Sequence, residues 1–220
     1  MSVTAPPTSA STRRGATGPL AFAAAGVLFL LYPATRPWGD SVEATTAAAY
    51  ASPAWLVSHL AAVAGFVLVG FGLLALRDQL TAGPGARLAG LALGTWWVGT
   101  GMVLPYFGAE VFALHTIGEH AVQTGDAAPL ALVETIRMSP TQVTLFGVGL
   151  LLLAMAAVLA AIAVARSGVL GRLSGLTFAA GFALFLPQFF TTPTLRILHG
   201  ALVAVGCVVL AVEMRRGAIR

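Results

Sequence analysis

Long apolar segments alternate along the chain with shorter polar connections. Crossing a hydrocarbon layer about 30 Å thick as a helix takes about 20 mostly apolar residues, because the bilayer offers backbone amides no hydrogen-bonding partner. Six segments approach this length, namely 19–34, 54–76, 88–106, 143–165, 173–190 and 197–214. We therefore predict an all-α fold, a polytopic integral membrane bundle of six transmembrane helices.

The connection after the third apolar segment covers residues 107–141, which is long for a compact bundle. Its pattern predicts two further short helices, at 109–123 and 130–138, separated by the turn-like sequence TGDAA. Pro105 is expected to bend the third helix where this connection begins. We expect the two short helices to form a lid over the outer end of the bundle.

The two ends of the chain differ in composition from the membrane domain, residues 19–214. Residues 1–18 are rich in Pro, Ser, Thr and Gly, which predicts a disordered cytoplasmic N-terminus. Residues 215–220 form a short basic cytoplasmic tail.

The overall composition agrees with a membrane protein. Of the 220 residues 58% are hydrophobic and 9% are charged, against roughly 25% charged in soluble domains. The chain contains no P-loop, dinucleotide fingerprint, GxSxG, HExxH or CxxC motif, and no segment has the basic and aromatic pattern of a nucleic-acid binder. Cys207 is the single cysteine, so a disulfide framework is excluded.

The distribution of arginine predicts the orientation. Basic residues are retained on the cytoplasmic side of short loops. With the N-terminus inside, nine of the twelve arginines lie on the cytoplasmic side, and Arg36, Arg137 and Arg196 lie outside. We therefore expect a multi-pass protein of the cell inner (plasma) membrane with both termini in the cytoplasm.

The same orientation places six of the eight acidic residues and all four histidines at or near the outer face. Glu110 lies on the apolar stripe of its predicted helix, so its carboxyl group should be protonated or paired with Arg137 or Arg196. His115 and Glu119 are four residues apart and can contact each other across one helical turn. We predict Glu110, His115 and Glu119 as acid and base residues.

The remaining outer polar residues predict a binding pocket. We expect it to open to the outer leaflet and to bind a lipid-like or otherwise amphiphilic small molecule, with acid–base modification of a lipid or isoprenoid as one use of the site. Whether the protein is an enzyme stays open at this point. The expected ligand-binding residues are Arg36, His59, Tyr106, His120, Arg137, Arg196 and His199.

Two cofactor interpretations compete with this one. His59 and His199 fall at matched depth in different helices and could hold a haem iron between them, as in a redox subunit. His115 and Glu119 could supply two ligands of a divalent metal, completed by His59, His120 or His199.

The partner classes also stay open. A third interpretation is a non-catalytic subunit or scaffold of a membrane complex. The expected partners are membrane lipids, a small amphiphile, and a partner membrane subunit or a second copy of the chain; nucleic acid is not expected.

A weak internal repeat links the two ends of the membrane domain. LAFAA at 20–24 and LTFAA at 176–180 are each followed by LFL, a proline and an arginine, which is Arg36 or Arg196. A true repeat would relate the first and last hairpins by an axis along the membrane normal. It would bring Arg36 and Arg196, together with His59 and His199 early in the following helices, to face each other at the outer mouth of the bundle.

Overall fold

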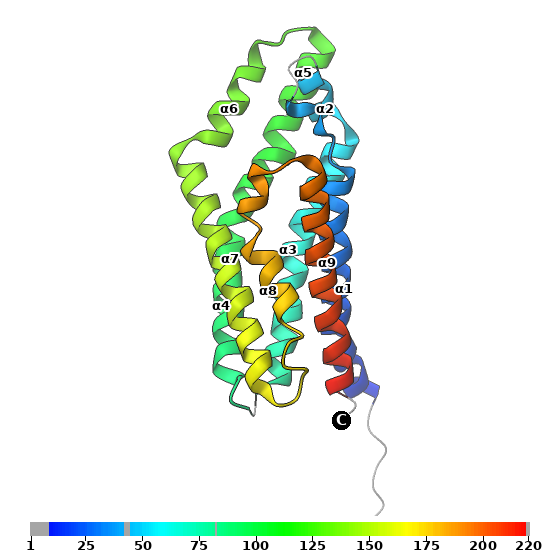
Figure 1. Ribbon diagram of the computed structural model, residues 1–220. Coiled ribbons are helices and arrows are strands. Elements are labelled where there is room, and N and C mark those ends of the chain that lie inside the picture. The colour runs from blue at the N-terminus through cyan, green and yellow to red at the C-terminus, as the bar shows by residue number, and fades with distance from the viewer. Residues whose placement is uncertain (1–8, 42–44, 82, 219–220) are drawn as a thin grey trace, which may run out of the picture.

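The computed structural model describes residues 9–41, 45–81 and 83–218, and within them the chain is helical with no β-strand. The long helices are α1 (Ser9–Thr35), α3 (Pro53–Gln79), α4 (Ala86–Gly108), α7 (Pro140–Ser167) and α9 (Pro193–Gly217) (Figure 1). The short elements are η1 (Trp38–Ser41), α2 (Thr46–Ala51), η3 (Ala109–Leu114), α5 (His115–Thr124), η4 (Ala128–Leu130), α6 (Ala131–Met138), α8 (Leu176–Ala183) and η5 (Pro187–Phe190).

Five helical stretches of the described chain are long and apolar enough to cross a membrane. They are Thr17–Thr35, Pro53–Gln79, Ala86–Thr124, Pro140–Ser167 and Pro193–Gly217. Large apolar side chains such as Val27, Phe71, Val98 and Leu151 are exposed on their outer surfaces, as expected for a surface that faces lipid. The prediction of an all-α membrane bundle is confirmed at this level.

The predicted fifth membrane helix, 173–190, is not continuous. It forms α8, which has 8 residues, and then the single turn η5. α8 ends at Ala183 because Pro187 lies four residues later, where its ring clashes with the Ala183 carbonyl in a continued helix. The count of six transmembrane helices is therefore not confirmed.

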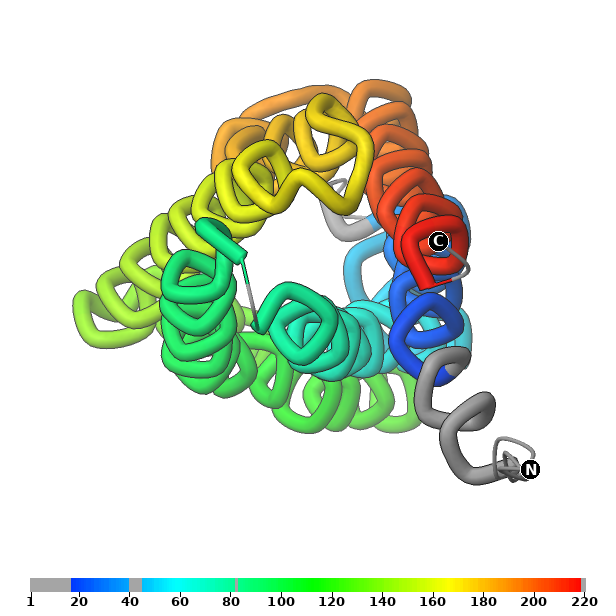
Figure 2. The backbone as a smooth tube through the Cα atoms, turned by 90° about the horizontal axis from the view of Figure 1, so that it is seen from below, coloured from blue at the N-terminus to red at the C-terminus, as the bar shows by residue number. Residues whose placement is uncertain are grey.

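The chain nevertheless runs back along the bundle between α7 and α9. α7 ends at the lower end in Figure 1, and α9 begins near the upper end. Residues 168–192 make this return, with α8 as their helical part. As a result, the first turns of α1 and the last turns of α9 lie at the same end of the bundle (Figures 1 and 2).

The third long helix extends far beyond its predicted end. Pro105 lies inside α4, and the helix continues through the π-helical turn η3 into α5, which stops at Gly125 with φ of 73°. The first predicted lid helix is thus the continuation of the third span, and α6 is the second. Closure of a lid over the bundle stays a prediction.

The N-terminal region also differs from the expectation. α1 begins at Ser9, so its backbone is helical through part of the segment predicted to be disordered. Residues 1–8 of that segment lie outside the described residues.

The interior of the bundle is filled by aromatic side chains. The helices surround it in the end-on view of Figure 2. Phe29 packs on Phe66 with ring centroids 4.9 Å apart, and the indole N–H of Trp96 donates to the Phe66 carbonyl at 3.0 Å. The other large buried rings are Phe22, Phe107, Phe178, Phe182 and Phe185. Because this core occupies the middle of the bundle, the two large pockets lie towards its ends.

Candidate functional site

A pocket of about 470 Å³ lies at the end of the bundle where α1 stops and α9 begins, away from the first turns of α1 and the last turns of α9. Five of its lining residues define what we call the polar pocket: Arg36, His59, Glu110, Arg137 and Arg196. They come from the segment after α1 and from α3, η3, α6 and α9, so the pocket forms only when distant parts of the chain pack together. Three of the five candidate membrane spans thus contribute to one site, through His59, Glu110 and Arg196.

Glu110 and Arg137 form a two-pronged ion pair inside the pocket. Arg137 Nε donates to Glu110 Oε1 and Arg137 Nη2 donates to Glu110 Oε2, each at 2.8 Å. The Glu110 residue is 3% exposed, and Arg137 Nη1 also donates to the Tyr50 hydroxyl at 3.1 Å. Arg137 and Arg196 were the two partners predicted for Glu110, and Arg137 is the one that forms the pair.

The electrostatic consequence for Arg137 is clear. Burial alone would lower the pKa of its guanidinium, but the hydrogen bonds and negative charge of Glu110 raise the pKa above its ordinary value. Arg137 is therefore a permanent cation, and its ion pair connects α6 to η3.

The π-helical turn gives Glu110 a second fixed contact. The indole N–H of Trp55 donates to the backbone carbonyl of Glu110 at 2.8 Å. A π-turn disturbs the regular bonding of an α-helix, and such turns occur often at functional sites. Trp55 satisfies the carbonyl at this irregular point and ties η3 to the first turn of α3.

His59 lies next to this pair and is almost fully buried, at 2% exposure. Its Nδ1 is 2.8 Å from the Trp55 carbonyl, which can only accept, so Nδ1 carries the proton of the neutral ring. Nε2 then keeps its lone pair and lies 3.9 Å from Glu110 Oε2. His59 is the histidine that lines the pocket beside the carboxylate.

Three arginines that line the pocket, Arg36, Arg137 and Arg196, alternate with the rings of Trp38 and Trp55 in an arrangement we call the ladder. The Arg36 guanidinium lies over Trp38 at 4.5 Å and over Trp55 at 4.8 Å, measured from Cζ to the ring centroid. Arg196 also lies over Trp38, at 5.2 Å, and Arg137 lies over Trp55, at 5.8 Å. Of the four residues that the repeat would bring together, Arg36 and Arg196 meet at Trp38, whereas His59 and His199 line different cavities.

The other predicted site residues have separate positions. Tyr106 lines the pocket and stacks on Phe146 with centroids 4.0 Å apart. His115 Nδ1 donates to the Tyr50 carbonyl at 2.7 Å, and its Nε2 is 3.5 Å from Glu119 Oε1, so the predicted pair forms. Neither residue of that pair lines the pocket, because α5 carries them beyond it.

His120 and His199 also lie outside the polar pocket. His120 is exposed on α5. His199 Nε2 donates to the Gly181 carbonyl at 2.7 Å, and its ring packs on Phe185. It lines a separate cavity of only about 10 Å³, so His59 and His199 do not share a cavity. Within the described residues, no three His, Cys, Asp or Glu side chains are placed to hold one metal ion.

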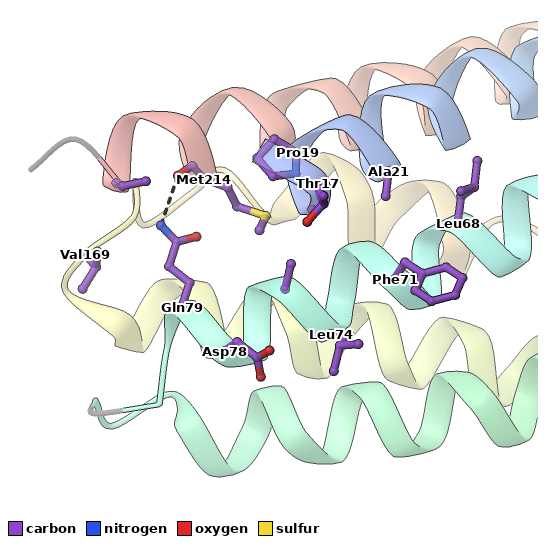
Figure 3. Close-up of a pocket in the computed structure, with 14 residues that line it drawn as sticks. Thr17, Pro19, Ala21, Leu68, Phe71, Leu74, Asp78, Gln79, Val169 and Met214 are labelled. Carbon is purple, nitrogen blue, oxygen red and sulfur yellow. Dashed lines mark hydrogen bonds between the residues drawn. The ribbon is translucent and has the colours of Figure 1, made fainter. Parts of the chain in front are cut away.

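A larger pocket, of about 780 Å³, lies between α1, α3 and α9 at the opposite end (Figure 3). Apolar side chains such as Phe71, Leu74 and Met214 form much of its lining. Gln79 reaches across it, and its side-chain amide donates to the Met214 carbonyl at 3.0 Å. We take the smaller polar pocket as the candidate site because it gathers the chemically active groups.

Sequence reasoning found Glu110, Arg137, Arg36, Arg196, His59 and Tyr106, but it did not assign Trp38 or Trp55 to the site. Trp38 follows Arg36 by two residues, a local signal that could have linked them. Comparisons with protein-family models, with curated proteins and with solved structures give no match. The function must therefore be argued from the pocket itself.

Proposed function

We propose that the protein binds an amphiphilic, lipid-like molecule in the polar pocket. The observation that carries the proposal is the division of one pocket into a charged part and an apolar part. The headgroup lies against the ladder and the Glu110–Arg137 pair, and the hydrocarbon tail lies against Val143, Phe146 and Leu186. Amphiphile recognition needs both surfaces within reach of one ligand.

The apolar part of the pocket continues to the outside of the bundle. Phe190 of η5 is 85% exposed, and Met138 and Val143 are 59% and 46% exposed. All three line the pocket. In a membrane, a hydrocarbon tail can reach the pocket from the lipid along these side chains. It then does not have to pass the arginines and Glu110.

The membrane arrangement that suits this function is the predicted one. The chain crosses the inner (plasma) membrane six times, with residues 168–192 as the fifth, interrupted crossing and both termini in the cytoplasm. The pocket then opens towards the outer leaflet, and the segment 107–141 covers it with Arg137. The positive-inside distribution of arginine and the shared end of α1 and α9 support this arrangement.

Acid–base chemistry on the ligand is a further part of the proposal. His59 replaces His115 as the base, since its Nε2 lone pair is beside the pocket and Nδ1 is fixed on the Trp55 carbonyl. The ion pair of Glu110 with Arg137 holds η3 and α6 in place at the pocket. A ligand hydroxyl at Nε2 is the group that this arrangement can deprotonate.

Native mass spectrometry of the detergent-purified protein tests the binding proposal. Gly147 lines the pocket, and no atom lies within 4 Å of a Cβ built on it, so Gly147→Leu fills pocket space. We expect this variant to lose the bound amphiphile about tenfold, which corresponds to about 1.4 kcal/mol. Gly94→Leu is the matched control, because Gly94 also has open space and does not line the pocket.

Equal retention of the amphiphile by both variants and the wild type would place the bound molecule elsewhere on the protein. Purification in a second, chemically different detergent separates a true ligand from bound detergent. A protein that carries no amphiphile in either preparation contradicts the proposal.

A further inference from the structure

Among the described residues of the polar pocket, one buried acceptor has no hydrogen-bond donor: the Nε2 atom of His59. The proton on Nδ1 is fixed by two acceptors, the Trp55 carbonyl at 2.8 Å and the Ser58 hydroxyl oxygen at 3.2 Å. The Ser58 hydroxyl itself donates to the Trp55 carbonyl at 2.9 Å, so its oxygen can accept from Nδ1. In the neutral ring Nε2 therefore keeps a lone pair, on a residue that is buried and lines the pocket.

The carboxylate beside Nε2 does not supply a donor. Glu110 Oε2 lies 3.9 Å from Nε2, which is too long for a hydrogen bond, and a carboxylate has no proton to give. Both Glu110 oxygens already accept from Arg137 at 2.8 Å, and the Tyr106 phenol interacts with the same carboxylate. Burying an acceptor without a donor costs free energy, so a ligand that donates to Nε2 is favoured over one that cannot.

Tyr32 offers the complementary donor next to His59. The two rings pack edge to face with centroids 5.4 Å apart, and both residues line the pocket. The Tyr32 hydroxyl makes no hydrogen bond within the part of the chain that the structure describes. The charged groups that act on this hydroxyl are those of the polar pocket, namely Arg36, Glu110, Arg196 and Arg137. Two adjoining rings therefore present an acceptor and a donor to the same pocket.

We infer that the group recognised by His59 and Tyr32 is a hydroxyl, which makes the ligand an amphiphilic alcohol. A hydroxyl donates its proton to Nε2 and accepts the Tyr32 proton with its oxygen. An ether, an ester or an ionised acid brings no proton for Nε2, and an ammonium group brings no lone pair for Tyr32. The inference rests on the proposed amphiphile binding and names its substrate class.

A competition experiment with the full-length protein tests the inference. Hexadecanol, its methyl ether, hexadecylamine and hexadecanoic acid share one tail. They are offered at equal concentration in neutral detergent, and bound masses are read by native mass spectrometry. We expect hexadecanol to be retained about tenfold over its methyl ether, because the ether leaves Nε2 unpaired. Equal retention of the ether and the alcohol overturns the inference, and so does retention of the amine or the acid above the alcohol.

Variants locate the preference. His59→Phe removes Nε2 and keeps an aromatic ring, so the ratio of alcohol to ether should fall close to one. His199→Phe is the matched control, because His199 lines a separate cavity and donates to the Gly181 carbonyl. An unchanged ratio in His59→Phe, or an equal fall in His199→Phe, overturns the inference.

A second variant separates the donor from the acceptor. Tyr32→Phe removes only the hydroxyl, so the ratio of alcohol to amine should fall about threefold, whereas the ratio of alcohol to ether should persist. This variant and the wild-type panel decide the question if His59→Phe does not fold. A ratio of alcohol to amine that does not change in Tyr32→Phe contradicts the assignment of Tyr32 as the donor.

Geranylgeraniol and its methyl ether repeat the comparison with an isoprenoid tail. The tail that shows the preference for the alcohol identifies the source of the hydroxyl, and a preference with neither tail overturns the inference. If every probe is retained alike and all are lost in Gly147→Leu, the proposed function stands and the alcohol inference fails. If no probe is retained, both fail.

Discussion

The two ends of the bundle use ionisable side chains in opposite ways. At the polar-pocket end, Arg137 bonds Glu110 across 27 residues of sequence and Tyr50 across 87. At the other end, Arg77 pairs with its neighbour Asp78, and Arg216 pairs with Glu213 three residues away. The first contacts join separate segments, whereas these two ion pairs each stay within one helix; the longer-range contact of Glu213 is with a backbone amide, the N–H of Gly171.

Burial separates the two ends in the same way. The Glu110 side chain is 4% exposed, whereas the side chains of Arg77 and Asp78 are 43% and 58% exposed. Exposed pairs contribute little to stability, and a buried pair often contributes no more than well-packed apolar side chains would. The buried pair is therefore better explained by the site it builds than by the stability it adds. The comparison teaches that the ion pair at the polar pocket is buried, whereas Arg77 and Asp78 at the other end stay exposed.

The largest expected effect comes from breaking the buried pair. Arg137→Ala leaves the Glu110 carboxylate buried without its partner and should reduce the free energy of unfolding by about 3–5 kcal/mol. Arg77→Ala at the other end should change it by about 0.5 kcal/mol or less. Reversible unfolding in mixed detergent measures both variants.

The double variant Glu110→Gln with Arg137→Ala sharpens this comparison. It should recover part of the lost stability, because the neutral amide removes the unpaired charge. Equal stability of Arg137→Ala and Arg77→Ala would show that the two ends do not differ in this respect.

A smaller effect is expected at the contact that holds α5 to α2. A Cβ at Gly118 would lie 2.5 Å from the Tyr50 Cβ and 2.8 Å from the Ala51 backbone nitrogen, so Gly118→Ala should destabilise the protein by about 1–3 kcal/mol. Gly90→Ala in α4 meets no atom within 4 Å and should be neutral or stabilising by up to about 1 kcal/mol. Both variants gain helix propensity, so the difference between their unfolding midpoints isolates the steric contact. Shifts of the same sign and size would contradict the close approach of the two helices.

The smallest effect concerns the indole that fixes the π-turn. Trp55→Phe keeps an aromatic ring and removes the N–H that bonds the Glu110 carbonyl, which should cost about 1 kcal/mol. Trp97→Phe is the control, because Trp97 is 40% exposed and lies on the outer surface. Thermal unfolding followed by circular dichroism ranks the two, and a larger loss for Trp97→Phe would reverse the predicted order.

The apolar pattern predicted most of the fold. The segments 54–76, 88–106, 143–165 and 197–214 each lie inside a long helix of the structure, because length and hydropathy suffice to identify such helices. The segment 173–190 is similarly apolar and similar in length, but Pro187 interrupts its helix. That proline is visible in the sequence, but proline is tolerated in membrane helices, and it also occurs within α1 and α4.

The site was predictable only where the signal is local or electrostatic. A buried acid needs a cation, which limited the partner of Glu110 to two arginines, and the four-residue spacing predicted the contact of His115 with Glu119. Apart from the neighbours Arg36 and Trp38, the ladder depends on packing among segments far apart in sequence, which no spacing predicts. The exclusion of His115 from the pocket likewise depends on the direction in which α5 leaves α4.

The interrupted return through α8 and η5 has a mechanical consequence. The five long helices cannot bend sharply without breaking several consecutive backbone hydrogen bonds, whereas residues 184–192 already lack a regular helical ladder. This stretch supplies Leu186 and Phe190 to the wall of the pocket. Rotation about a few of its backbone bonds would therefore shift Leu186 and Phe190 at the wall of the pocket and leave the long helices unchanged.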